Sequence, residues 1–282
     1  MSETTGIPEP RVPGADPVPD AAPATAAPPP RPALRPAWRW GAAVLVFALL
    51  TGSVAYGVTQ AERGDVPGLA TKSDGRWDYP RLKFPALPSG SPRPFAKGNP
   101  ARVHHADLRE LLLPAPRGAK TDTSLPDIEG GWITQDDYLA VYEESERRTL
   151  GQFVTSYAVR HIAARGWAMP DGTRTQIHLL RFNTRAYPER LAYGTLLGES
   201  DVALPLEGGE NSVWDPSWPK DAKVPGVERH VYDEAAPRGK RHVRHAYLVA
   251  GDTLALIVQS RPGSAPELPF QQTVLLQSQL LG

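Results

Sequence analysis

Residues 40–58, WGAAVLVFALLTGSVAYGV, lie in the longest stretch of the chain without a charged residue. A helix rises 1.5 Å per residue, so about 19 residues nearly cross the ~30 Å hydrocarbon core of a bilayer. We therefore expect a transmembrane helix over residues 38–60 that contacts membrane lipid through residues 40–58. This helix would separate a short N-terminal tail from a C-terminal part that is long enough to fold.

The charges that flank this stretch predict its orientation. Arginines precede it at positions 31, 35 and 39, and no acidic residue lies between Asp20 and the stretch. Positive charge resists translocation, so we expect a single-pass protein of the cell membrane with a cytoplasmic N-terminus and an extracytoplasmic C-terminal domain. Small residues at Ser53-Val54-Ala55 and Thr59-Gln60-Ala61 leave cleavage as a secretory signal as the alternative.

Composition excludes several classes of protein. The chain has no cysteine, so it forms no disulfide and carries no lipid on a cysteine. It has 31 basic and 31 acidic residues. A general nucleic-acid binder would show a basic excess, so we expect no nucleic-acid partner.

Composition also divides the chain into segments. Residues 1–37 are rich in proline and alanine and cannot bury enough apolar surface to offset the entropy of ordering, so we expect a disordered cytoplasmic tail. Residues 61–100, where proline recurs with glycine and serine, predict an extended stalk that its aromatic residues can lay across the folded part. Residues 101–282 are long enough for one extracytoplasmic domain.

Periodicity and turn residues predict the elements of this domain. Pro170-Asp171-Gly172 is a strong turn signal and predicts a hairpin of residues 155–167 and 173–182. Thr134 is a favourable N-cap for a helix that runs to about residue 150 and ends at Gly151. The remaining expected elements are helices over residues 106–113, 186–197 and 269–281 and a meander of strands over residues 227–233, 242–249 and 253–259. The expected fold class is α+β, an antiparallel sheet of about five strands with helices packed on it.

Two histidines follow the same dipeptide, in Val-Arg-His at residues 159–161 and 243–245. His161 and His245 are expected to be structural residues whose hydrogen bonds are satisfied. The alternative is that they face each other in the core and sense pH. His242 and His245 are three residues apart on a strand and so lie on opposite faces, which spoils the simplest metal site.

No motif nominates a catalytic residue, a metal ligand or a cofactor. The chain lacks H-E-x-x-H, G-x-S-x-G, a P-loop and a dinucleotide fingerprint. The acidic residues of the long loop over residues 198–224 do not follow the spacing of a calcium loop. Enzymatic activity therefore stays open, and an exported hydrolase is the hypothesis with the least support.

The most distinctive short stretch is Trp214-Asp215-Pro216-Ser217-Trp218, in the same polar loop. Two tryptophans there can stack on a sugar or anchor a protein partner, so Trp214 and Trp218 are the candidate binding residues. The alternative is that they plug the loop onto the domain. A basic run follows in the sequence and is expected to be the solvated end of a hairpin: Arg238, Lys240, Arg241 and Arg244.

Three phrases, HADLRELLLPAP, RHIAARGWAMPDGTRT and QTVLLQSQLLG, resemble uncharacterised actinomycete single-pass membrane proteins with an exported α+β domain. The resemblance implies an envelope location and supplies no catalytic residues. The leading hypothesis is an outer domain that binds or senses an envelope protein, a cell-wall ligand or a small molecule. The alternative is a structural or scaffold component of a membrane complex.

Overall fold

The computed structural model describes residues 34–60, 74–122, 131–197, 202–209, 211–219, 221–235 and 239–282. The chain divides into two compact units, Met1–Lys72 and Ser73–Gly282. Within the first unit, residues 1–33 of the predicted tail lie outside the described residues, and helix α1 spans Leu34–Gln60. The second unit contains all the strands.

Helix α1 forms where the sequence predicts a helix, but the predicted membrane span needs correction. Within the described residues, no helix combines the length and the apolarity that crossing a bilayer requires. The apolar side chains of α1 are interrupted at Thr51 and Ser53. Their hydroxyls donate to the carbonyls of Phe47 and Leu49, at 2.6 Å and 2.7 Å.

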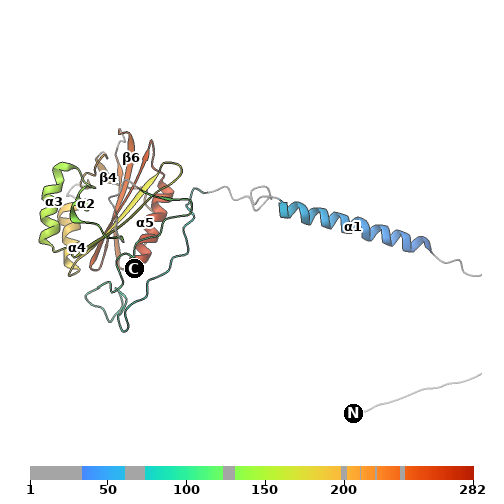
Figure 1. Cartoon of the computed structure of the whole chain (residues 1–282), viewed down its shortest axis with the longest axis horizontal. Coiled ribbons are helices and arrows are strands. Elements are labelled where there is room, and N and C mark those ends of the chain that lie inside the picture. The colour runs from blue at the N-terminus through green and yellow to red at the C-terminus, as the bar shows by residue number, and fades with distance from the viewer. Residues whose placement is uncertain are drawn as a thin grey trace, which may run out of the picture. The chain divides into compact units, whose positions relative to one another are not determined.

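Within the part of the chain that the structure describes, seven strands form one antiparallel sheet in the order β1-β2-β3-β7-β6-β5-β4 (Figure 1). They are β1 Lys120–Thr121, β2 His161–Ala168, β3 Arg174–Arg181, β4 Ser212–Trp214, β5 Val227–Glu234, β6 Arg241–Ala250 and β7 Thr253–Pro262. The hairpin and the meander are confirmed as β2–β3 and β5–β6–β7. The predicted first strand of the hairpin begins too early, because β2 starts at His161 and residues 155–156 end a helix. They join through β3 and β7, so strands that are far apart in sequence form the centre of the sheet.

The α+β class is confirmed, but the predicted strand number of about five is wrong. The additional strands β1 and β4 lie at the two edges and contain only two and three residues. An alternation of period two cannot be recognised in so few residues, and β4 lies inside what the sequence predicts as a loop. These strands are specified by pairing with their neighbours rather than by a local pattern.

Helices cover both faces of the sheet (Figure 1). One face carries α5, Glu267–Leu281, together with residues 74–113, a segment that we call the strap. The other face carries α2 Gln135–Leu139, α3 Glu144–Ser156, α4 Ala186–Leu191 and the π-helix η2 Ala192–Leu196. Alternate residues of each strand serve the two layers, as Ile257 and Leu256 of β7 do.

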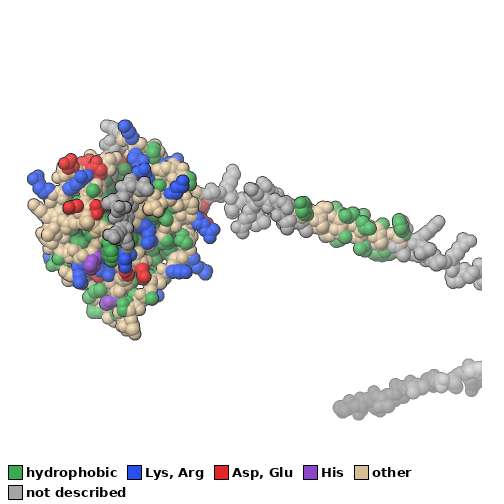
Figure 2. Space-filling view, in the orientation of Figure 1, with side chains coloured by type: hydrophobic (Ala, Val, Ile, Leu, Met, Phe, Trp, Pro, Cys, Tyr) green, Lys and Arg blue, Asp and Glu red, His purple; other side chains and the backbone are tan. Residues whose placement is uncertain are grey.

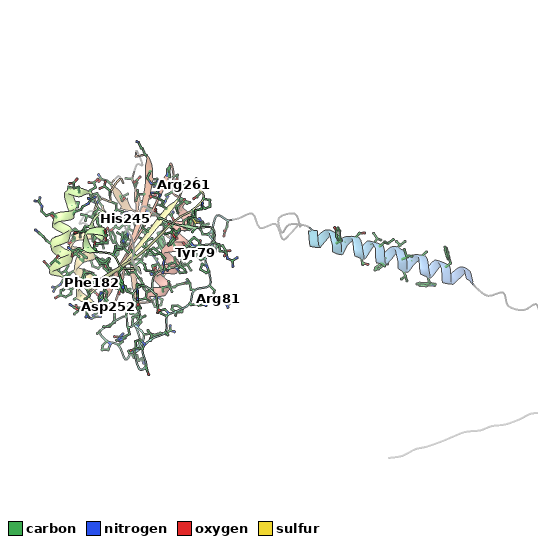
Figure 3. The ribbon with its side chains drawn as sticks, viewed as in Figure 1. Tyr79, Arg81, Phe182, His245, Asp252 and Arg261 are labelled. Carbon is green, nitrogen blue, oxygen red and sulfur yellow. The ribbon has the colours of Figure 1, made fainter. Side chains whose placement is uncertain are left out.

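Aromatic residues of the strap, among them Tyr79, bond to α5 (Figure 3). The hydroxyl of Tyr79 shares a hydrogen bond of 2.7 Å with the hydroxyl of Thr273. The backbone N–H and carbonyl of Trp77 both bond to the side-chain amide of Gln272, each at 2.9 Å. The compact unit therefore begins at Ser73, and the described part of the predicted stalk belongs to the folded domain.

Residues 106–113 do not form the predicted helix. Short turns hold the segment, and the side chain of Gln277 on α5 takes up its backbone groups. The N–H of Leu113 donates to Oε1 of Gln277 at 2.9 Å, and Nε2 of Gln277 donates to the carbonyl of Leu111 at 2.9 Å. Burial of consecutive leucines against α5 outweighs the local helical preference.

The helix predicted from Thr134 to residue 150 is instead the pair α2 and α3. Thr134 caps α2 as expected, because its Oγ1 accepts from the N–H of Asp137 at 3.1 Å. Gly151 lies inside α3 rather than at its end. A Cβ at this position would lie 3.0 Å from Cδ1 of Leu139, so the glycine allows α2 to lie close against α3.

Candidate functional site

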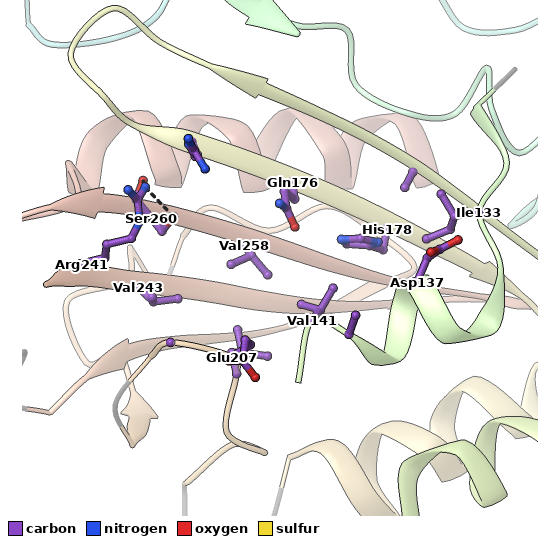
Figure 4. Close-up of a pocket in the computed structure, with 15 residues that line it drawn as sticks. Ile133, Asp137, Val141, Gln176, His178, Glu207, Arg241, Val243, Val258 and Ser260 are labelled. Atoms are coloured by element: carbon purple, nitrogen blue, oxygen red, sulfur yellow. Dashed lines mark hydrogen bonds between the residues drawn. The ribbon is translucent and has the colours of Figure 1, made fainter. Parts of the chain in front are cut away.

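A cavity of about 380 Å³ opens on the sheet face that carries α2 (Figure 4). Its floor consists of β3, β7 and β6, and its walls include α2 and the loop at residues 206–208. Small-molecule sites commonly have volumes of roughly 300–1,000 Å³ and combine apolar walls with a few polar groups. The cavity is therefore large enough for a small organic ligand.

The register of the central strands positions the floor. Gln176 of β3 lies opposite Val258 of β7, and Arg174 lies opposite Ser260. On the other side of β7, Ser260 lies opposite Val243 of β6. Residues directly opposite each other in an antiparallel pair point to the same face. Three strands thus bring these five side chains together on the floor of the cavity.

One end of the cavity carries two guanidinium groups, those of Arg174 and Arg241. Arg241 donates to the carbonyl and the hydroxyl of Ser260, at 3.2 Å and 3.0 Å, and both acceptors are neutral. Burial and then the charge of Arg174 lower the pKa of Arg241, while the charge of Asp122 opposes this shift. Among the described residues, neither guanidinium lies within ion-pair distance of a carboxylate. This end therefore favours an anion.

His178 closes the other end of the cavity. Its side chain is 1% exposed, and its ring meets the ring of Tyr138 edge-on at 5.9 Å. Burial lowers the pKa of His178 to about 4, so the imidazole is neutral near pH 7 and offers one donor and one acceptor. Neither ring nitrogen has a hydrogen-bond partner among the described residues. Buried polar groups rarely stay unpaired. The ring of His245 shares this state in the core, and of the two rings only that of His178 lines the cavity.

The two ends of the cavity are well separated (Figure 4). His178 lies beside Asp137, and Arg241 and Ser260 lie at the opposite end. In the sheet, His178 pairs with Leu256, four residues before Ser260 on the same strand. At 3.2–3.4 Å per residue the two ends are about 13 Å apart.

The carboxylates that line the cavity are already bonded within the protein. Asp137 accepts from the N–H and the hydroxyl of Thr134, at 2.9 Å and 2.7 Å. Glu207 accepts from Arg147 at 2.8 Å. They therefore hold α2 and the 206–208 loop in place, while at the other end the guanidinium of Arg241 bonds only to Ser260 among the described residues.

The serine and the histidine that line the cavity lie at its opposite ends. A nucleophile and its base must lie within hydrogen-bond reach, near 3 Å. The hydroxyl of Ser260 bonds to Arg241, and the imidazole of His178 is about 13 Å away by the strand geometry. The cavity therefore holds no serine–histidine pair among its described residues.

The two candidate tryptophans line one hollow but differ in burial. Trp214 lies on edge strand β4 and is 43% exposed, whereas Trp218 is 9% exposed and joins the core on the α5 face. The guanidinium of Arg229 lies over the ring of Trp218, 4.6 Å from its centre. A second hollow, of about 500 Å³, lies between the two tryptophans and is distinct from the sheet cavity. Contact of Trp214 and Trp218 with a partner stays a prediction.

The alternative of a His161–His245 pair is wrong. The expectation of two satisfied structural histidines is wrong as well, because neither ring nitrogen of His245 has a hydrogen-bond partner among the described residues. His161 is exposed at the start of β2, where its ring lies 5.4 Å from Trp132. His245 is fully buried on β6, where it stacks on Tyr232 at 5.2 Å (Figure 3). Strands β3 and β7 lie between β2 and β6 in the sheet. Burial lowers the pKa of His245 to about 3, so this ring is a neutral core residue.

The residues that line the cavity are not singled out by the sequence. Gln176 and His178 alternate with Ile177 and Leu179, a pattern typical of a strand with one solvated face. Helix α2 covers that face, so His178 is buried. The sequence does contain one signal of the cavity, which is a histidine on the polar side of a strand.

Comparison with known proteins adds no family assignment. No family model and no curated protein matches the chain. One solved structure, the extracellular domain of PknH from Mycobacterium tuberculosis, shows a distant likeness at 12% identity and a TM-score of 0.28. The likeness covers 58% of this chain and 78% of that one.

Proposed function

We propose that Ser73–Gly282 is an extracytoplasmic binding or sensing module whose small-molecule ligand lies in the sheet cavity. The observation that carries this proposal is the buried imidazole of His178, which lines the cavity without a hydrogen-bond partner among the described residues. A ligand with a polar end and an apolar body would pair this group and cover Val258 and Val243.

A fluorescence titration with N-phenyl-1-naphthylamine, an uncharged apolar probe, tests the proposal. We expect saturable one-to-one binding to the wild-type protein and at least tenfold weaker binding to V258W, because the larger side chain fills the floor of the cavity. V202W is the matched control, since Val202 is exposed and lies outside the cavity. Equal affinity of V258W and wild type, with both folded, would remove the cavity from the proposal.

The extracytoplasmic location and the contact of residues 40–58 with membrane lipid belong to the same proposal. Large apolar side chains of α1 are exposed, among them Phe47 and Leu50, and exposed apolar surface of this kind favours association with lipid (Figure 2). Protease treatment of protoplasts that carry a C-terminally tagged protein tests both points. We expect a membrane-bound, protease-sensitive tag, whereas a protected tag would place the domain inside the cell.

A second candidate function is docking of an envelope protein through Trp214. The envelope location is what the resemblance to actinomycete membrane proteins implies. Two exposed aromatic side chains, Trp214 and Tyr193, lie against His230, with ring centroids 6.1 Å and 5.4 Å from the imidazole. Tyr193 also donates a hydrogen bond to Glu228. Exposed aromatic side chains with polar neighbours are typical of contact residues.

Alanine substitution separates docking from core packing. W214A should weaken capture of a partner and leave the melting temperature near that of wild type, because Trp214 is substantially exposed. W218A should lower the melting temperature, because Trp218 is nearly buried under Arg229. A large loss of stability in W214A would show instead that Trp214 is a packing residue.

A further inference from the structure

The two ends of the sheet cavity differ in charge, and this difference restricts the ligand. We infer that the cavity binds an elongated organic anion whose carboxylate, sulfonate or phosphate group pairs with Arg174 and Arg241 while its apolar body lies over Val258 and Val243. This inference rests on the proposed function, because it names the class of ligand for the same cavity.

The cationic end of the cavity is suited to an oxyanion. Arg174 and Arg241 line the cavity together, and the charge of Arg174 contributes to the lowered pKa of Arg241. Two like charges that share a cavity end repel each other, and an anion between them removes that cost. Guanidinium groups bind planar or tetrahedral oxyanions through paired N–H donors, so a carboxylate, sulfonate or phosphate fits this end.

The negative charges near the cavity do not replace such an anion. The charge of Asp122 attracts Arg241, yet no ion pair joins the two side chains among the described contacts. Glu207 is bonded to Arg147, and Asp137 is bonded to the N-cap of α2. Asp137 also lies beside His178, at the end opposite Arg241 (Figure 4).

The remaining surface sets the shape of the ligand. Val258 forms the middle of the floor, between the arginines and His178, and Val243 lies level with Arg174 and Ser260 at the arginine end. The imidazole of His178 then offers one donor or one acceptor to the far end of the ligand, about 13 Å from the acid group. An inorganic anion alone would occupy only the arginine end.

Two probes that differ mainly by a sulfonate test the inference. They are 1-anilinonaphthalene-8-sulfonate and the uncharged N-phenyl-1-naphthylamine, each titrated by fluorescence into the wild type, R174Q, R81Q and V258W. Arg174 is exposed enough for R174Q to fold, and Arg81 provides a control with the same change of charge, in the strap and outside the cavity (Figure 3). We expect the wild type to bind the sulfonate at least tenfold more tightly than the neutral probe, and R174Q alone to abolish this preference.

The outcomes separate the inference from the proposed function. Binding of both probes with equal affinity, blocked by V258W, would retain the binding cavity and overturn the preference for an anion. A preference that survives in R174Q or disappears in R81Q would also overturn it. If neither probe binds, or if V258W leaves the binding unchanged, the proposed function itself is overturned and the inference with it.

Discussion

His178 is the residue on which the proposed function depends. The burial of its imidazole makes the stability of the domain depend on pH. Burial lowers the pKa of His178 to about 4, whereas the pKa of an unfolded histidine is about 6.5. As pH falls, the unfolded chain therefore takes up this proton before the folded protein does. The free energy of unfolding decreases as pH falls through the window from about 6.5 to about 4.

Replacement of His178 by phenylalanine should remove this part of the acid sensitivity. Between pH 7.5 and pH 5 the wild type should lose about 2 kcal/mol of stability through His178, and H178F should lose correspondingly less in urea titrations at the two pH values. His245 contributes a similar loss to both proteins. H161F is the control, because His161 is exposed. An equal loss in H178F and wild type would show that His178 is not buried in the neutral form.

Gly251 is a second residue whose role follows from geometry. It has a φ of +55° in the β6–β7 turn, and a Cβ there would lie 2.1 Å from the carbonyl oxygen of Arg102. That carbonyl accepts from the N–H of Asp252 at 3.2 Å. The side chain of Asp252 also bonds to His104, at 2.7 Å, so the strap is fastened to this turn.

Alanine at Gly251 should therefore destabilise the domain by about 3 kcal/mol or more, since the clash involves backbone that cannot move alone. Gly263 is a matched control with a φ of +82°, where a Cβ would have no atom within 4 Å. G263A should cost only about 1 kcal/mol, the strain of a left-handed alanine. Urea unfolding of the two variants compares the costs, and similar values would contradict the close approach of Arg102.

At the scale of elements, the strap behaves as part of the core rather than as a linker. Its half-buried side chains pack against the α5 face: Trp77, Tyr79, Leu82, Leu87 and Phe95. Each such side chain contributes roughly 1–3 kcal/mol when buried. A chain shortened to begin at residue 101 should therefore melt about 10 °C or more below a chain that begins at residue 73. Equal melting temperatures in differential scanning calorimetry would show that the strap does not stabilise the domain.

Elements with a long periodic pattern could be predicted from the sequence, as β2, β3 and the β5–β7 meander show. The helix expected over residues 106–113 could not be predicted correctly, because the amide of Gln277, 164 residues away from Leu113, takes the place of helical bonds. The close packing of α2 against α3 likewise depends on Gly151, where a Cβ would lie 3.0 Å from Cδ1 of Leu139. Tertiary contacts of this kind leave no local signal.

The candidate site shows the same limit. Arg174, Gln176 and His178 occupy one face of one strand, which the sequence indicates, but their neighbours come from β6, β7 and α2. The pairing of β3 with β7 that brings them together joins two halves of the chain. By contrast, the distinctive Trp214–Trp218 stretch is conspicuous in the sequence because both of its tryptophans lie within five residues.

At the scale of the whole molecule, the protein combines a three-layered domain, with a cavity between the sheet and α2, and a separate helical unit with exposed apolar side chains. The central claim is that the sheet cavity, rather than the Trp214–Trp218 loop, receives the small-molecule ligand. The two regions contain different reporters, the imidazole of His178 and the indole of Trp214.

The most direct test is an NMR titration of the protein with 1-anilinonaphthalene-8-sulfonate, which follows the side-chain resonances of both reporters in one sample. We predict that the His178 resonances shift and saturate at one equivalent while the Trp214 indole N–H resonance stays in place. A shift of the Trp214 resonance with no change at His178, or no change at either, would contradict the claim.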